Sequence, residues 1–169
     1  MQKITPFLWF EKNCEEAVNF YIDVFMNSPH KSKDSKVINI IRYEKGMDAP
    51  GMPEMEGKVI TAVFELNGER FMALDGGPVF KFNESISFLV DCEDQEEVDY
   101  FWEKLSAHPE NEQCGWLKDK FGVSWQIIPR EMGEILGNED RKKAMRATNA
   151  MLQMKKIDIQ KLRDAFHGN

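Results

Sequence analysis

Few residues of this sequence have both the type and the spacing that chemistry requires. Five polar side chains stand out within or at the ends of apolar, strand-like stretches: Asp75, Ser85, Ser87, Ser124 and Gln126. Successive side chains of a β-strand point to opposite faces, so residues two apart share a face. We therefore expect these side chains to line one cleft.

The chemistry open to this set is limited. Asp75 is the only side chain placed to act as a general base, and no His or Cys is placed to form a nucleophile pair. Asp75 precedes Gly76, and aspartate before glycine commonly accepts hydrogen bonds from a local turn, which is the competing interpretation. Polar side chains among apolar ones are typical of a site for a small ligand. The competing interpretation is a solvated face or a satisfied network at a dimer seam.

The same alternation assigns apolar residues to the cleft. If Phe7 and Trp9 pack against the helix that follows them, Leu8 faces the cleft. Phe71 shares a face with Asp75, whereas Trp125 points away from Gln126 into helix packing. The predicted site has Asp75 as its catalytic residue and the following ligand-binding residues: Leu8, Phe71, Ser85, Ser87, Ser124 and Gln126.

Strand and helix signals follow one another in the same order twice. Apolar runs predict strands at 4–10, 37–43, 58–66 and 69–74, and again at 85–90, 112–117 and 123–128. Asn67-Gly68 predicts a tight hairpin turn, and 46–57, rich in Gly, Pro and Met, predicts a loop.

Each copy also has a capping box before an apolar helical stripe. The boxes are Asn13 with Glu16 and Asp94 with Glu97, at an offset of 81 residues. Two boxes in the same context indicate an internal repeat whose second copy is shorter.

The chain changes character after Pro129. Helices are predicted at 141–154 and after Asp158, with Gly168 as a stop. Residues 129–169 hold 9 Lys or Arg against 6 acids, whereas residues 1–128 hold 13 against 23. A basic amphipathic tail beside an acidic body suggests docking, on its own module or on a partner subunit. An ordinary solvated helix face is the competing interpretation.

Composition excludes several classes of function. The formal charge of -7 argues against a nucleic-acid surface. Cys14, Cys92 and Cys114 are an odd number without CxxC spacing, so neither a disulfide framework nor a zinc ribbon is indicated. The apolar start of the chain is too short for a signal peptide or a membrane span. We expect a reduced, cytoplasmic protein with no nucleic-acid or membrane partner.

Several segments carry a likeness to a known family: 4–10, 14–21, 71–76, 85–90, 114–119, 121–129 and 154–159. On these segments the chain resembles the glyoxalase, bleomycin-resistance and extradiol dioxygenase (vicinal oxygen chelate) superfamily. Within it, the chain is similar to the PhnB-like branch, often labelled demethylubiquinone methyltransferase.

The resemblance implies an α+β fold of two tandem βαβββ-type modules that form a half-open cleft, plus a C-terminal helical extension. The two modules would span 1–80 and 81–129, and the second would be shortened. Together they would form a domain at 1–129, followed by the helical tail at 130–169. The superfamily also commonly forms dimers, and a half-open sheet leaves an edge and an apolar face to cover. We therefore expect a homodimer.

The superfamily's metal ligands would fall on Pro6, Asp75, Ser85 or Ser87, and Gln126. Proline has no donor atom, and serine and glutamine are poor ligands for a transition metal. We expect no metal and no cofactor. Methyl transfer is also not expected, because Gly76-Gly77 is followed by Pro78 and not by the capped helix of a cofactor-binding turn.

Three hypotheses follow. The first is a protein that binds a small molecule in the sheet cleft without a metal. The second is a metal-independent lyase or isomerase that uses Asp75 as its base. The third is a small dimeric module that works through its basic tail. The sequence does not decide whether the chain is an enzyme.

Overall fold

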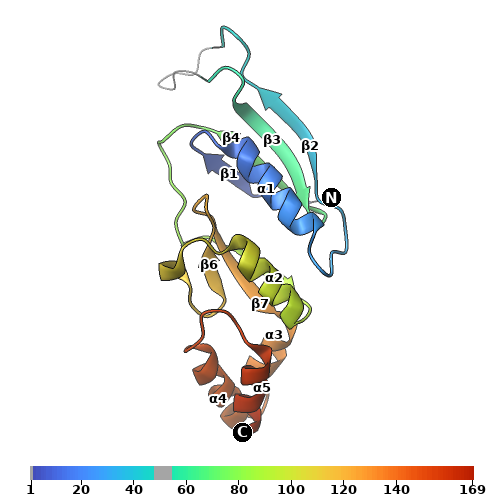
Figure 1. Cartoon of the computed structure of the whole chain (residues 1–169), viewed down its shortest axis with the longest axis vertical. Helices are drawn as coiled ribbons and strands as arrows, with labels where there is room; N and C mark the ends of the chain where they lie inside the picture. Colours follow the sequence, from blue (N-terminus) through green and yellow to red (C-terminus); the bar gives the residue numbers. More distant parts are fainter. Residues whose placement is uncertain (1, 48–54) are drawn as a thin grey trace. The chain divides into compact units, whose positions relative to one another are not determined.

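The computed structural model describes residues 2–47 and 55–169 (Figure 1). The chain divides into two units, Met1–Phe82 (unit 1) and Asn83–Asn169 (unit 2). Residues 48–54, most of the loop predicted at 46–57, lie outside the described residues. Each unit is an α+β structure with its own mixed sheet and its own helices.

Unit 1 is a sheet with one helix packed on it. Its elements are β1 (Phe7–Phe10), α1 (Cys14–Met26), β2 (Lys36–Arg42), β3 (Val59–Leu66) and β4 (Glu69–Asp75). The strand order is β1-β4-β3-β2, with β1 parallel to β4 and the other pairs antiparallel. The predicted hairpin turn is confirmed, because Asn67 and Gly68 have φ values of 47° and 84°, positive at both central positions as a type I′ turn requires.

Unit 2 repeats this plan with one strand fewer and adds a helical tail. Its elements are β5 (Phe88–Cys92), α2 (Gln95–Leu105), η1 (Pro109–Asn111), β6 (Trp116–Lys118), β7 (Ser124–Pro129), α3 (Arg130–Leu136), α4 (Arg141–Met151) and α5 (Ile159–His167). The strand order is β5-β7-β6, again with the first strand parallel to the last. The strand predicted at 85–90 begins three residues later, at Phe88.

The two predicted capping boxes have different outcomes. Asp94 accepts a hydrogen bond from the backbone N–H of Glu97 at 3.0 Å, and the Glu97 carboxylate accepts from the Glu93 backbone at 2.7 Å. Asn13 makes no side-chain cap bond, so the box predicted there is wrong. The N-terminus of α1 instead receives a carboxylate from the end of β4, Asp75, at 2.8 Å from Cys14 N.

The C-terminal tail docks on unit 2 through the main chain. Cys114 and Gly115 donate backbone hydrogen bonds to the carbonyls of Met154 and Lys155, both at 2.8 Å. The side chain of Gln95, in the first turn of α2, donates to Ile157 O at 3.1 Å and accepts from the backbone N–H of Ile159 at 2.9 Å. Gly115 has a φ of 88°, and a Cβ there would lie 2.7 Å from Ile128 Cδ1, so only glycine suits this turn.

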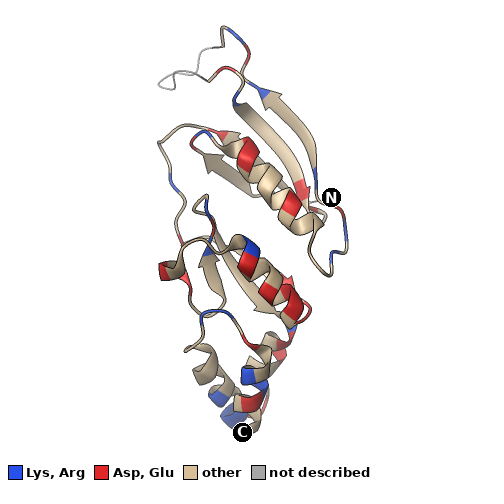
Figure 2. Cartoon of the chain, in the orientation of Figure 1, with Lys and Arg blue, Asp and Glu red and all other residues tan. Residues whose placement is uncertain are grey.

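Charge reinforces the docking. Lys and Arg gather on the C-terminal helices, and several acidic residues lie along α2 (Figure 2). Three tail cations pair with acids of 83–128 at 3.0, 3.2 and 2.6 Å: Arg130 with Asp91, Lys155 with Glu112, and Lys156 with Asp99. The number of these ion pairs equals the excess of Lys and Arg over acids in the tail, which is three (9 against 6). Of the two docking modes that the sequence left open, the described residues show the one on the tail's own module.

The tail also has its own small core. Ile135, Ala147, Ile157 and Leu162 are buried together, and Ile157 and Leu162 have no exposed surface. Asp158 caps α5 by accepting from Lys161 N at 3.0 Å, and Gly168 ends the helix in a left-handed conformation, both as predicted. No helix within the described ranges is long and apolar enough to cross a membrane.

Deleting residues 130–169 is expected to unfold unit 2 and to spare unit 1. The deletion removes the acceptors of Cys114 and Gly115, the two backbone partners of Gln95 in the tail, and a buried apolar cluster. Hydrogen exchange should show lost protection in α2 and β7 and retained protection in β3 and β4.

A charge-only variant is the control for this deletion. The triple change Arg130→Gln, Lys155→Gln, Lys156→Gln keeps the backbone bonds and the apolar cluster, so only a small, salt-sensitive effect is expected from these exposed pairs. Full protection of α2 in the truncated chain would contradict the prediction.

Candidate functional site

One face of strand β7 in unit 2 is buried, on the side of the sheet where α2 packs. Trp125 and Ile127 are 2% and 0% exposed, and Leu117 of β6, in register with Trp125, is 1% exposed. The Trp125 ring lies 5.5 Å from that of Phe88, and its Nε1 donates to Asp119 at 2.8 Å. As the alternation predicts, Trp125 belongs to the packed core.

The opposite face, which we call the distal face of unit 2, carries the polar residues. Gln126 is in register with Trp116 of β6 and Leu89 of β5, and Ser124 with Lys118. Residues directly opposite one another on neighbouring strands share a face. Ser124 and Gln126 therefore lie on one side of β7, away from Trp125, as predicted.

The structure connects two of the predicted serines to this face differently. Gln126 Nε2 donates to Ser87 Oγ at 2.8 Å, which joins β7 to the residue before β5. Ser85 is exposed, lies in a turn before that strand, and bonds to the side chain of Asn83. The strand predicted to carry both serines begins only at Phe88, so Ser85 is not on the distal face by strand alternation.

Ser124 is unusual among these residues. It is 2% exposed, and its Oγ has no hydrogen-bond partner among the residues that the structure describes. A buried hydroxyl without a partner costs free energy. The absence of a protein partner therefore calls for an explanation.

In unit 1 the two faces of the sheet are the reverse of those predicted. Leu8 and Phe71, expected to face a ligand, are 6% and 9% exposed, and they lie on the α1 side of the sheet together with Asp75. Phe7, expected beneath the helix, is 49% exposed. The strand 7–10 is apolar at every position, so its sequence contains no alternation from which to choose a face.

The distal face of unit 1, opposite α1, consists of residues that were expected beneath the helix or were not expected at the site. It carries Phe7 and Trp9 of β1 in register with Met72 and Leu74 of β4. The position of Asp75 in the sequence could have indicated which residues of β1 face the helix. If Asp75 caps α1, then its register partner Phe10, and with it Leu8, must face the helix.

Asp75 has two structural partners. One carboxylate oxygen accepts from Cys14 N at 2.8 Å and the other from Val59 N at 3.0 Å, and the residue is 2% exposed. A carboxylate at a helix N-terminus is stabilised by the unpaired N–H groups and the helix dipole. The competing interpretation of Asp75 as a backbone acceptor describes these contacts, although its donors are distant and not those of a local turn.

A hollow of about 360 Å³ lies beside the N-terminus of α1 and includes Asp75 in its lining. Its wall is polar and charged, with Lys12, Glu15 and Lys58 among the lining residues. Arg42 makes two hydrogen bonds to Glu15, at 2.8 and 2.6 Å, and these lower the pKa of the Glu15 carboxyl. A substrate in this hollow would compete with the backbone N–H groups for the Asp75 carboxylate.

The buried thiols are not nucleophiles. Burial, and after it the charge of Asp75, raises the pKa of Cys14 to about 12. Burial also raises the pKa of Cys92. Because the thiolate is the reactive form, both thiols are inert near neutral pH.

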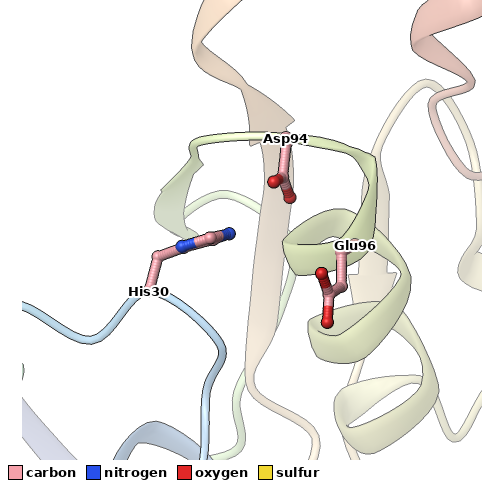
Figure 3. A group of neighbouring side chains, drawn as sticks. All are labelled: His30, Asp94 and Glu96. Atoms are coloured by element: carbon pink, nitrogen blue, oxygen red, sulfur yellow. The ribbon is translucent and has the colours of Figure 1, made fainter.

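Figure 3 draws three further side chains, which belong to different units. Asp94 and Glu96 stand at the start of α2, where Asp94 is the N-cap and Glu96 lies in the first turn. His30 lies in the loop after α1 of unit 1. The other histidines are His108, ahead of η1, and His167, at the end of α5.

The positions at which the resemblance predicts metal ligands do not fit a metal. Pro6 has no donor atom, and both oxygens of Asp75 accept backbone N–H bonds. Ser87 and Gln126 are neutral and bonded to each other. Zinc and iron favour imidazole, thiolate and free carboxylate ligands, and none of these positions supplies one.

The sequence matches a family model over residues 2–128, that of 3-demethylubiquinone-9 3-methyltransferase. The chain belongs to this family. A structure described as a putative 3-demethylubiquinone-9 3-methyltransferase, PhnB protein, from Bacillus cereus is 39% identical, with a TM-score of 0.59. The match covers 76% of this chain and 99% of that one. The predicted PhnB-like relationship is thus confirmed.

A crystal structure of a protein from Pseudomonas aeruginosa is 20% identical with a TM-score of 0.52, covers 76% of this chain and 98% of its own, and shows a likeness of fold. No curated protein matches the sequence. The family match ends at residue 128, so α3–α5 and the likeness expected at 154–159 lie outside it.

Adjacent residues of β7 are expected to respond in opposite ways to replacement in this PhnB-like family member. Trp125→Ala removes a buried ring and its hydrogen bond to Asp119, and should lower the free energy of unfolding by about 3–5 kcal/mol. Gln126→Ala removes one part-buried hydrogen bond and should cost less than about 1.5 kcal/mol. Chemical denaturation of both variants measures this. A melted Gln126→Ala beside a silent Trp125→Ala would show that the faces are reversed.

Proposed function

We propose that this chain binds a small organic molecule on the distal face of unit 2, without a metal ion. The observation that carries the proposal is Ser124, whose buried hydroxyl has no partner within the described residues and which lies two residues from Gln126. Polar groups that are few in number and set among apolar side chains are typical of small-molecule sites.

The residues at the positions expected for metal ligands support the metal-free part of the proposal. Their donors are absent, neutral or already occupied by backbone N–H groups. A divalent ion would compete with the backbone N–H groups for Asp75 and would gain only one carboxylate. Binding by hydrogen bonds and apolar contact involves no such competition.

Methyl transfer, the activity in the family's name, has no support in the glycine pair of this chain. Gly76 and Gly77 follow β4 and lead into irregular backbone that continues to Ser87. A glycine-rich turn that holds a nucleotide-like cofactor opens directly into a helix, whose N-terminus binds the anionic group. We therefore favour binding of another kind of molecule.

The experiment separates binding from catalysis by Asp75. A panel of small neutral and anionic aromatic compounds is titrated into protein treated with a chelator, and turnover is assayed in parallel. We expect binding that the chelator does not change and that Gln126→Ala weakens. Stoichiometric zinc, nickel or iron whose removal abolishes binding would overturn the proposal.

Asp75→Asn is the matched variant for the lyase or isomerase alternative. It replaces one acceptor by an amide donor against a backbone N–H, so we expect a loss of about 1–3 kcal/mol in stability and unchanged ligand affinity. Turnover by the unaltered protein that this folded variant lacks would favour the enzyme.

We further propose that the chain forms a homodimer that covers apolar surface. Phe7 and Ile41 are 49% and 51% exposed, and Phe7 belongs to the distal face of unit 1. Exposed apolar faces of sheets favour association. Sedimentation at micromolar concentration is expected to give twice the 19.7 kDa chain mass, and a monomer would refute the proposal.

A further inference from the structure

We propose that the ligand of the distal face is an uncharged, ring-containing compound with a hydrogen-bond donor next to an acceptor, such as a carboxamide. Ser124, Gln126 and Ser87 would bind its polar end. This inference rests on the proposed function and adds the chemical class of the ligand.

The hydrogen-bonding capacity of the three side chains indicates such a group. Gln126 uses one Nε2 hydrogen on Ser87, which leaves its second N–H and its Oε1 for a ligand. Ser87 accepts that bond and keeps its own hydroxyl hydrogen. The Ser124 hydroxyl is buried and has no partner among the described residues, so it adds a donor and an acceptor when the ligand displaces the side chains that cover it. The set therefore offers donors and acceptors together, as a carboxamide does.

The charges around this set argue against an anionic ligand. Lys118, in register with Ser124, pairs with Glu84, and its side chain is only 18% exposed. Arg130, directly after β7, pairs with Asp91 at 3.0 Å. Both cations are thus already paired, so a carboxylate or phosphate would gain only neutral donors here, and burying a charge without a cation costs free energy.

The apolar neighbours argue for a ring. Trp116 and Leu89 flank Gln126 in register on either side, so that an indole, a carboxamide and an isobutyl group form one row across the sheet. Trp116 is half-buried and Leu89 is 57% exposed. A flat ring can lie on such a row while its polar substituent reaches Gln126 and Ser124.

Benzamide and benzoate test the class directly, because they share size and shape and differ in charge. The full-length protein, labelled with nitrogen-15, is titrated with each compound while the backbone amides of Leu89 and Trp116 and the side-chain amide of Gln126 are followed by NMR. We expect saturable shifts at these positions with benzamide and weaker ones with benzoate. Ser124→Ala and Gln126→Ala should each weaken benzamide binding by about threefold to tenfold, the effect of one hydrogen bond.

Thermal stability provides the matched control. Ser106, at the C-cap of α2, donates to Glu112 at 2.6 Å, so Ser106→Ala should lower the melting temperature and leave benzamide binding unchanged. Ser124→Ala removes a hydroxyl that has no partner within residues 2–47 and 55–169, so its melting temperature should stay the same or rise. A lower melting temperature for Ser124→Ala would mean that the hydroxyl serves the fold, and would overturn the inference.

The remaining outcomes separate the inference from the proposed function. Benzoate that binds these residues as well as benzamide overturns the uncharged class and leaves a metal-free ligand site in place. Benzamide binding that both variants leave unchanged overturns the role of the three side chains alone. If neither compound shifts these resonances, the inference and the site on this face both fail.

Discussion

The carboxylate of Asp75 determines how unit 1 is assembled. It ends β4, accepts from the first residue of α1 and also accepts from the first residue of β3. Three elements thus depend on one side chain that is almost fully buried. Because β1 is parallel to β4 and in register with it, this contact also decides which residues of β1 lie beneath the helix. Leu8 and Phe10 lie beneath α1 because they share the face of the sheet from which Asp75 contacts the helix.

In unit 2 the helix N-terminus is capped by a residue that is adjacent in sequence. Its helix is capped by Asp94, which lies directly before it, and the strand position that ends the ladder is held by Pro129, opposite Cys92. In unit 1 the ladder ends with Phe10 opposite Asp75. One module therefore caps its helix from a distant strand and the other from its own connecting segment, although the order of strands is shared.

This difference explains how far sequence could predict the structure. The strands, the hairpin at Asn67-Gly68 and the repeat could be predicted, because each has a local signal in turn residues or apolar runs. The face that each strand of unit 1 turns toward α1 could not be predicted. The helices start 81 residues apart, at Cys14 and Gln95, whereas the strand ends Phe10 and Cys92 lie 82 apart. The connection in unit 2 is one residue shorter, and a shift of one residue exchanges the two faces of a strand.

The tail meets unit 2 largely through atoms that every amino acid possesses. Met154 and Lys155 contribute carbonyl oxygens to Cys114 and Gly115, and Gln95 reads the main chain of Ile157 and Ile159. Such contacts constrain the path of the backbone and leave most side chains along it free to diverge. A homologue whose last forty or so residues look unrelated could keep the same attachment, provided that it retains a glutamine on the helix and a glycine at the turn. Evolutionary drift in this segment would then conceal a conserved piece of architecture.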